Sequence, residues 1–351
     1  MRFDISPKLI SMNDIIEIGC LNIESTISII EEAFKEYKRG NIELPDKISQ
    51  IFDEETQNRI NCMPATLKSV GICGVKWVSV FPNNPKNFGI PNVSGLIVLS
   101  NTINGYPIAI MDGTLITSLR TACVGAIGAK YLAKKESRVY ATIGSGEQAK
   151  MHFMTIKSQF PTIKECRVAS LNYESEMEFI NDLESKYPDV NFVAYNGNTD
   201  DVSKDADIIV TAVSCQKPLL KANTIKKGAF YCHVGGWEDE YEVPLMADKI
   251  VCDMWESVKH RTQTISRLYK QGKLSDKDIY SDICNIIDGT FPGRETDDEF
   301  IYFNSVGLAF IDIAIAYEIY KKSSNESRSH NWCMQDKKIF DYIKEQGKNE
   351  H

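Results

Sequence analysis

The sequence predicts an α/β protein in which a doubly wound parallel sheet follows a smaller, mostly antiparallel sheet. From Val139 onwards, β-prone runs alternate with helical patterns, and repeated βα units favour a parallel sheet. Before Val139, β-prone runs follow one another through short, turn-rich connections. The parallel strands are expected at 139–143, 166–171, 192–195, 207–213, 228–234 and 249–253.

The first part of the chain is expected to open with an amphipathic helix from about Asn22 to Arg39. Its apolar residues recur at helical spacing, and Gly40 is a plausible stop. Asn104-Gly105 is a hairpin signal between two apolar runs. Strands in this part are expected at 47–52, 59–63, 71–80, 94–100 and 106–111.

Two further helices and a polar tail complete the layout. A helix rich in small residues is expected over 117–134, and a polar break follows at 134–137, where we place a domain junction. A hydrophobic helix is expected from Gly307 to Lys321; it is too short to cross a membrane and carries charges, so it is expected in the core. The last thirty residues are polar apart from a patch at 339–343 and are expected to form a docked or partly ordered tail.

Composition excludes several classes of function. The 351 residues carry a net charge of −8, so no basic surface points to nucleic acid. No apolar run reaches membrane-spanning length, and the first residues lack the layout of a signal peptide. The ten cysteines form no C-x-x-C pair, and the histidines show no ligand spacing, so no metal site is expected. We expect a cytoplasmic protein with reduced thiols.

A glycine turn after the first parallel strand indicates a dinucleotide-binding loop. The strand at 139–143 runs into Gly144-Ser-Gly146, and a helical pattern begins at Glu147. Gly144 would make the tight turn, Gly146 would let the backbone approach a pyrophosphate, and Ala149 is small enough for close helix–strand packing. The helix N-terminus would supply unpaired N–H groups. The alternative is an ordinary strand-to-helix turn.

Six segments, in order over roughly residues 45–320, resemble the ornithine cyclodeaminase/μ-crystallin family of NAD(P)-dependent oxidoreductases. They are Gly74-Val-Lys-Trp77, Leu119-Arg-Thr-Ala122, Ile143-Gly-Ser-Gly-Glu-Gln-Ala149, Val234-Gly-Gly236, Gly293-Arg294 with Asp298-Glu299, and Ser305-Val-Gly-Leu-Ala309. The resemblance implies a Rossmann domain at 134–309, inserted in an α+β substrate-binding and dimerisation domain made of 1–133 and 310–351. It also implies a homodimer, with the strands at 94–100 and 106–111 as candidate interface.

The resemblance implies four substrate contacts. Lys76 corresponds to the family's substrate lysine, although an alternating strand also permits an outward-facing lysine. Arg120 would contact both the nicotinamide cofactor and the substrate carboxylate. Lys47 falls where relatives often carry an arginine that grips the carboxylate, and a lysine keeps the charge but loses the bidentate geometry. Val306 would lie towards the substrate.

The catalytic carboxylate is a second point at which this chain departs from the family. Ornithine cyclodeaminases place an aspartate straight after the glycine pair, and here that position is Trp237. Glu238 and Asp239 follow, and we expect one of them, Glu238 first, to serve as the catalytic carboxylate. An acidic surface loop without this role is the alternative.

The glycine pattern and the resemblance together imply a set of cofactor contacts at strand ends and turns. No basic residue follows Asn172, the ribose-reading position, closely, which favours NAD, but NADP is not excluded. The expected contacts are Arg120, Gly144, Gly146, Gln148, Ala149, Asn172, Thr211, Val213, Val234, Gly235 and Ser305.

The resemblance implies hydride transfer at the carbon–nitrogen centre of an amino acid or a cyclic imine. The first hypothesis is an ornithine cyclodeaminase, which converts ornithine to proline and ammonia with no net NADH and would belong to proline biosynthesis. The second is a net imine reductase or amino-acid dehydrogenase, including the siderophore-precursor type. The third is a non-catalytic cofactor or ligand binder of the μ-crystallin kind, which the tryptophan at position 237 keeps open.

Overall fold

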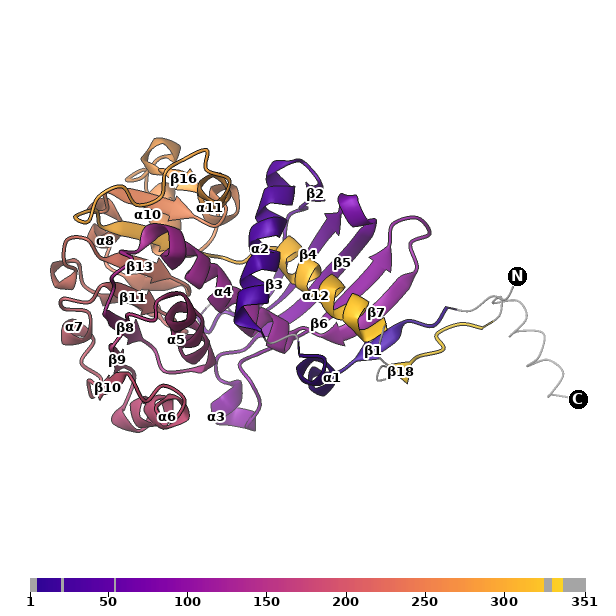
Figure 1. Ribbon diagram of the computed structural model, residues 1–351, viewed down its shortest axis with the longest axis horizontal. Coiled ribbons are helices and arrows are strands. Elements are labelled where there is room, and N and C mark those ends of the chain that lie inside the picture. The colour runs from indigo at the N-terminus through magenta and orange to yellow at the C-terminus, as the bar shows by residue number, and fades with distance from the viewer. Residues whose placement is uncertain (1–4, 20–21, 54, 325–329, 337–351) are drawn as a thin grey trace, which may run out of the picture. The chain divides into compact units, whose positions relative to one another are not determined.

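The computed structural model describes residues 5–19, 22–53, 55–324 and 330–336, which form two compact units. The antiparallel-sheet unit takes its described residues from 1–22, 39–117 and 309–351. The parallel-sheet unit consists of 23–38 and 118–308. Figure 1 labels many of the elements of both units. Among the described residues, no helix is both long and apolar enough to cross a membrane.

The antiparallel-sheet unit is built on one eight-stranded sheet. Its order is β18-β1-β7-β6-β5-β4-β2, with β3 paired to β4. The β6–β7 connection contains Asn104-Gly105, and Gly105 has a φ of +73°, so the predicted hairpin is confirmed. The strands are β1 (Lys8–Ile10), β2 (Ile42–Glu43), β3 (Ile48–Asp53), β4 (Asn58–Leu67), β5 (Ile72–Val80), β6 (Val93–Asn101), β7 (Pro107–Asp112) and β18 (His330–Asn331).

Helix α12 (Ala309–Ser324) covers one face of this sheet and contacts β4, β5 and β6 (Figure 1). The contact is close at Gly74, where a Cβ would lie 2.7 Å from the Ile313 side chain and 2.8 Å from the Val98 carbonyl oxygen. The sequence prediction that this apolar helix belongs to the core is therefore confirmed. The unit also holds α1 (Met12–Glu17), η1 (Lys68–Val70) and α3 (Asn84–Phe88).

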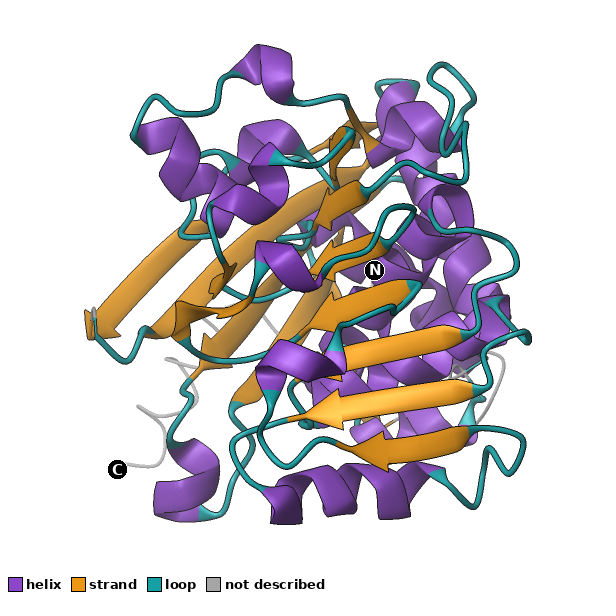
Figure 2. Cartoon of the chain, turned by 90° about the vertical axis from the view of Figure 1, so that its left-hand side faces the viewer, coloured by secondary structure: helices purple, strands orange, loops and turns teal. Residues whose placement is uncertain are grey.

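The parallel-sheet unit carries a second eight-stranded sheet, in which all pairs of neighbouring strands are parallel. Figure 2 shows strands of this sheet side by side in orange, with helices in purple. The six strands expected between residues 139 and 253 are all present. The order is β10-β9-β8-β11-β13-β17-β15-β16, comprising β8 (Val139–Ile143), β9 (Glu165–Ala169), β10 (Asn191–Ala194), β11 (Ile208–Thr211), β13 (Phe230–His233), β15 (Lys249–Cys252), β16 (Ser281–Asp282) and β17 (Ile301–Asn304).

The order of the strands identifies the edge at which a ligand binds. From β8 the chain runs outward through β9 and β10 and then returns to β11 on the other side of β8. Ligands of open parallel sheets bind outside the carboxyl ends of the strands where the order reverses in this way. The reversal here lies between β8 and β11, directly after the glycine turn.

The parallel-sheet unit also contains a small two-stranded sheet and a set of helices. The Trp237–Asp239 segment, where no strand was expected, forms a strand, β14, which pairs with β12 (Gln216–Leu220) in a separate two-stranded sheet. Side-chain alternation over three residues is too short to reveal a strand. The helices are α2 (Ile23–Lys38), α4 (Thr114–Leu132), α5 (Glu147–Gln159), α6 (Tyr173–Leu183), α7 (Thr199–Val202), η2 (Ala222–Thr224), α8 (Glu242–Leu245), α9 (Trp255–Val258), α10 (Thr264–Lys270), η3 (Asp276–Asp278) and α11 (Ile283–Ile287).

The units divide the helices differently from the expected boundary at residue 134. Helix α2 and most of α4 group with the parallel sheet, and α2 contacts α11 and α5. Lys130 on α4 donates to Glu31 on α2 at 2.7 Å. An amphipathic pattern shows that a helix buries one face, but not which sheet it packs with. The tail patch at 339–343 lies outside the described residues.

Candidate functional site

The glycine turn after β8 is built around a close backbone approach. Gly144 has a φ of +112°, and its N–H donates to the Ala169 carbonyl at 2.8 Å. A Cβ on Gly144 would lie 2.5 Å from the Ala212 carbonyl oxygen, in the segment that follows β11. This position therefore requires glycine both for its dihedral angle and for the space beside it.

At Gly146, neither the backbone dihedral angle nor the surrounding space requires glycine. It is the N-cap of α5, and its backbone is extended, with a φ of −76° that any residue adopts. Nothing lies within 4 Å of the place where its Cβ would be, so the N-terminus of α5 faces open space. The N–H groups of this 13-residue helix can therefore be reached by an anion. Ala149, one turn further, is fully buried.

The neighbouring polar side chains form hydrogen bonds with other groups of the protein. The Gln148 amide nitrogen donates to the Ser118 carbonyl at 3.4 Å, and the Ser145 hydroxyl donates to the Ser170 hydroxyl at 2.8 Å. Asn172, at the expected ribose-reading position, is the N-cap of α6, and its side-chain oxygen accepts from the Ser175 N–H at 2.9 Å.

The buried carboxylate of Glu176, on α6, is hydrogen-bonded to backbone groups of two loops. Glu176 accepts hydrogen bonds from the N–H groups of Ser170 at 2.9 Å, Asn196 at 2.7 Å and Gly197 at 2.7 Å. It ties together the loops after β9 and β10. Beside it, Leu171 is 97% exposed. The loop after β9 thus exposes an apolar side chain, Leu171, next to the polar Asn172.

Glu238 on β14 is fully buried and accepts three hydrogen bonds. The Thr211 hydroxyl and the Val213 N–H each donate at 2.7 Å, and the Gly235 N–H donates at 2.8 Å. A Cβ on Gly235 would lie 2.4 Å from a Glu238 carboxylate oxygen and 2.6 Å from the Val213 carbonyl oxygen. Gly235 is therefore glycine because the Glu238 side chain and the β11 loop come so close to it.

Asp239, also fully buried, belongs to a polar cluster that meets Glu238 at His233, whose Nε2 lies 3.7 Å from a Glu238 carboxylate oxygen. Asp239 accepts from the Thr264 hydroxyl at 2.5 Å and from the Tyr302 hydroxyl at 3.4 Å, and His233 Nε2 lies 3.3 Å away. Burial raises the pKa of Asp239 to about 6, against the opposing pull of His233. Trp237, at the position of the family's aspartate, stacks on Tyr241 with ring centroids 5.7 Å apart.

Asp253, which directly follows β15, organises the turn that follows β17. One of its carboxylate oxygens accepts from the Ser305 hydroxyl at 3.1 Å and from the N–H groups of Val306 and Gly307, each at 2.8 Å. Burial raises the pKa of Asp253 above its ordinary value even though these donors oppose the shift. Gly307 has a φ of +78°, and a Cβ there would lie 2.4 Å from an Arg120 guanidinium nitrogen. The guanidinium group thus lies against the turn.

In the antiparallel-sheet unit, Lys76 is fully buried rather than facing outward. Its ammonium group lies 2.7 Å from the Asp312 carboxylate on α12, and both side chains have no exposed surface. Lys47 is half-buried in the connection between β2 and β3. Trp77 points to the opposite face of the sheet and is 47% exposed.

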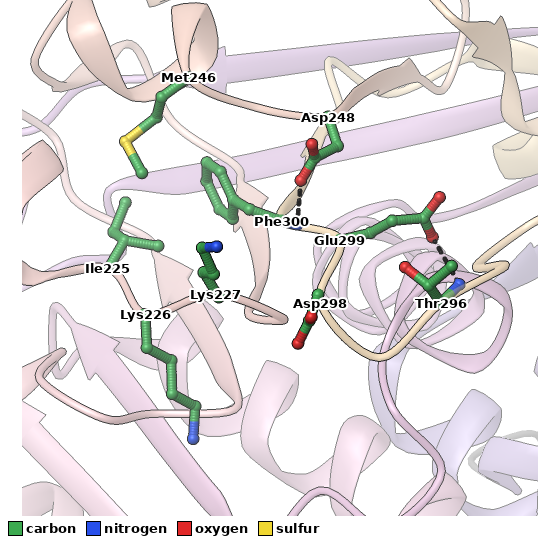
Figure 3. A pocket seen from close by; sticks show the side chains of 9 residues that line it. All are labelled: Ile225, Lys226, Lys227, Met246, Asp248, Thr296, Asp298, Glu299 and Phe300. Atoms are coloured by element: carbon green, nitrogen blue, oxygen red, sulfur yellow. Dashed lines mark hydrogen bonds between the residues drawn. The ribbon is translucent and has the colours of Figure 1, made fainter.

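A hollow of about 330 Å³ lies at the other edge of the parallel sheet (Figure 3). Lys227, Asp248 and Phe300 line it, and each precedes the amino end of a parallel strand. Figure 3 shows two of its polar groups already engaged: the Phe300 N–H donates to Asp248 at 2.7 Å, and the Thr296 N–H donates to Glu299 at 3.3 Å. Because cofactors of such sheets bind at the carboxyl edge, this hollow is not the dinucleotide site.

The expected cofactor contacts therefore converge at one edge of the parallel sheet. Strand register places Ile143, Thr211, His233 and Asn304 side by side at the carboxyl ends of β8, β11, β13 and β17. Gly144, Val213, Val234 and Ser305 continue from these strand ends. Lys47 and Lys76 belong to the other unit.

Three buried carboxylates that organise the structure were not predicted from the sequence. Asp253 follows a buried apolar strand, and Asp312 interrupts an apolar helix, so each carried a readable signal: a charge in or beside a segment that is otherwise buried. Glu176 carried no such signal, because it lies in an acidic helical stretch typical of a solvated surface.

Comparisons with known proteins agree with this architecture. The model of the ornithine cyclodeaminase/mu-crystallin family matches residues 9–327. N-((2S)-2-amino-2-carboxyethyl)-L-glutamate dehydrogenase from Staphylococcus aureus is 30% identical over 322 residues, which cover 91% of this chain and 96% of that protein.

Two solved structures have closely similar folds. Delta(1)-pyrroline-2-carboxylate reductase from Thermococcus litoralis, in complex with NADH and L-proline, matches with a TM-score of 0.86 and 27% identity over 93% of this chain and all of that one. An archaeal alanine dehydrogenase dimer with bound NAD matches with a TM-score of 0.85 and 29% identity over 94% of this chain and all of that one. The chain belongs to the ornithine cyclodeaminase/mu-crystallin family.

Proposed function

We propose that this protein is an NAD-dependent oxidoreductase that interconverts an amino acid and its imine with a net change in NADH. We infer a net reaction from the burial and hydrogen bonding of the two carboxylates that follow Gly235-Gly236. Both Glu238 and Asp239 are fully buried and hydrogen-bonded to protein groups. A cyclodeaminase needs a carboxylate at this turn to act on the substrate amine. A dehydrogenase or reductase needs only hydride transfer and a defined position for the substrate.

The cofactor is NAD rather than NADP. Its pyrophosphate would lie at the open N-terminus of α5, beside Gly146. No lysine or arginine occurs between Ser170 and Ser185, where an NADP enzyme is expected to hold the ribose phosphate. NADH or NAD is present in the structures of the reductase and the alanine dehydrogenase described above. When bound, the nicotinamide accepts or supplies the hydride.

Arg120, in the parallel-sheet unit, and Lys76, in the antiparallel-sheet unit, are the two cationic residues to which we assign roles in binding cofactor and substrate. The guanidinium group of Arg120 lies against the Gly307 turn, which Asp253 fixes, and its planar shape suits a contact with the cofactor or with a carboxylate. The Asp312 carboxylate lies 2.7 Å from the ammonium group of Lys76 and compensates its charge. Lys76 thereby presents a proton donor to the carboxylate or nitrogen of the substrate. Lys76→Ala is expected to abolish turnover and to leave NADH binding intact.

The substrate class is an α-amino acid or a cyclic imine. The chain's relatives include Delta(1)-pyrroline-2-carboxylate reductase, alanine dehydrogenase and N-((2S)-2-amino-2-carboxyethyl)-L-glutamate dehydrogenase, and each of these names describes a substrate with a carboxylate beside a carbon–nitrogen bond. Ornithine cyclodeamination remains the second candidate, because a lysine cyclodeaminase shares the fold with a TM-score of 0.83.

One panel of assays separates these functions. The protein is incubated with NAD and L-alanine, L-proline or L-ornithine, and with NADH and Delta(1)-pyrroline-2-carboxylate, while NADH, proline and ammonia are measured. A net change in NADH supports the proposal. Proline and ammonia from ornithine without net NADH would replace it by the cyclodeaminase. NADH binding with no turnover across the panel would leave the non-catalytic binder.

We also infer that the protein is a homodimer that pairs through the uncovered face of the antiparallel sheet. Strand register places Ile48, Cys62, Trp77 and Leu96 in one row on this face. Ile48 is 64% exposed, Trp77 47% and Leu96 53%, whereas α12 covers the opposite face. A row of exposed apolar side chains on a sheet face favours a protein partner. The related archaeal alanine dehydrogenase was solved as a dimer.

A further inference from the structure

We propose that Glu238 is a positioning residue that sets the backbone of the cofactor crevice, and not the catalytic carboxylate. The assignment rests on the proposed NAD-dependent function and specifies how the site is held. Glu238 reaches two separate strand ends at once. It accepts from Thr211 and Val213, at the end of β11, and from Gly235, which follows β13.

The hydrogen bonds of Glu238 matter for cofactor binding because of where their donors lie. The strand order reverses between β8 and β11, so Val213 lies beside the reversal where a dinucleotide binds. Gly144 in the phosphate-binding turn approaches the neighbouring Ala212 carbonyl so closely that a Cβ would lie 2.5 Å from it. The carboxylate of Glu238 therefore fixes a loop that the glycine turn packs against. A shift of that loop would therefore also move the glycine turn.

In this arrangement the hydrogen bonds of Glu238 tie its carboxylate to protein groups. The side chain has no exposed surface, and its two oxygens receive three donors, two of them backbone N–H groups. Backbone donors cannot rotate away, so the acceptor must be a carboxylate. A glutamine in this place has one acceptor oxygen and an NH₂ group that would face at least one N–H.

Gly235 and Glu238 form a matched pair. A Cβ on Gly235 would lie 2.4 Å from the Glu238 carboxylate oxygen, and the Val213 carbonyl oxygen blocks the other side at 2.6 Å. Gly235→Ala therefore displaces the same carboxylate without altering its charge. Two chemically different substitutions should thus produce one phenotype.

The test measures NADH affinity by fluorescence titration, together with kcat and the KM for NAD, in Glu238→Gln and Gly235→Ala. Glu240→Gln is the matched control: it is two residues away, and its carboxylate accepts from the Ala222 N–H at 3.1 Å, in η2. We expect both test variants to weaken NADH binding and raise the KM for NAD by about tenfold or more, with kcat within about threefold of wild type. The control should stay within about twofold.

Two outcomes would overturn the assignment. A fall in kcat of about a hundredfold or more in Glu238→Gln, with unchanged NADH affinity, would make Glu238 a catalytic residue. Unchanged affinity and unchanged kcat would make it dispensable. If Glu238→Gln does not fold, Gly235→Ala decides by the same criteria. Absence of NADH binding by the wild-type protein would instead refute the proposed function itself.

Discussion

Lys76 and Asp312 form an ion pair with 2.7 Å between Nζ and a carboxylate oxygen, and neither side chain has any exposed surface. The pair joins the middle of β5 to the first turns of α12. Each charge therefore depends on the other, because an isolated charge in such a place is strongly disfavoured.

Removal of one member of this pair should cost more than removal of both. Asp312→Asn leaves a buried ammonium group without its carboxylate and is expected to lower the free energy of unfolding by about 3 kcal/mol. The double variant Lys76→Met, Asp312→Leu fills the same space with apolar atoms and should recover most of that loss. Urea denaturation measures both. A double variant less stable than Asp312→Asn would show that the pair itself stabilises the unit.

The two glycines of the cofactor turn should respond differently to the same substitution. Gly144→Ala places a Cβ 2.5 Å from the Ala212 oxygen at a φ of +112°, so it should destabilise the protein by about 2 kcal/mol. Gly146→Ala has open space and an ordinary φ, so its stability should change by less than about 0.5 kcal/mol.

Binding distinguishes the second glycine from a neutral position. The added methyl group of Gly146→Ala would stand before the N-terminus of α5, so NADH affinity is expected to fall about tenfold or more while the melting temperature stays unchanged. Fluorescence titration with NADH gives the affinity. An unchanged affinity for NADH in this variant would show that the pyrophosphate does not bind beside Gly146.

The uncovered sheet face predicts a substitution that separates the dimer. Trp77→Glu puts a charge in the middle of the apolar row and should shift the mass measured by light scattering from dimer to monomer. Phe88→Glu is the control, since Phe88 is 72% exposed but lies on α3, away from the sheet. A dimer that survives Trp77→Glu would place the interface elsewhere.

Asp239 should give the protein a measurable dependence of stability on pH. Its pKa in the folded protein is about 6, against about 3.9 for an unfolded aspartate. Between these values the folded protein holds a proton that the unfolded chain has lost. Stability from this group is therefore present below about pH 4 and is lost as the pH rises through 6, by about 3 kcal/mol in total.

Asp239→Asn removes this titration and isolates its effect. The difference in unfolding free energy between the wild-type protein and the variant should fall as the pH rises from 4.5 to 7.5 and then level off. Chemical denaturation at a series of pH values gives the curve. A difference that is constant over this range would show that the aspartate titrates normally.

Strands and glycine turns were the part of this fold that the sequence made predictable. The strand at 139–143 was located to the residue, and the turn at Gly144 was recognised, because β-prone runs and glycines act locally. The burial of Glu238 was not predictable in the same way. Its partners Thr211, Val213 and Gly235 are joined only when two parallel strands pair, and three acidic residues in a row look like a solvated loop.

The same limit explains the two ends of the described chain. β1 is three residues long and β18 two, too short for any periodic pattern, yet they pair with each other, and the Ile5 N–H donates to the Gln335 carbonyl at 2.8 Å. Likewise, Lys76 was readable as a lysine in an apolar strand, but its partner lies 236 positions later in the sequence, at Asp312.

The long separation between β5 and α12 sets an order for folding during synthesis. The strands β4 to β7 leave the ribosome early, but the helix that covers them is made only after residue 308, when every segment of the parallel-sheet unit already exists. Until then the apolar inner face of the first sheet, with the Lys76 ammonium group in its midst, has no cover. The portion of the chain translated first is thus the portion completed last, and it is the natural place for a chaperone to act.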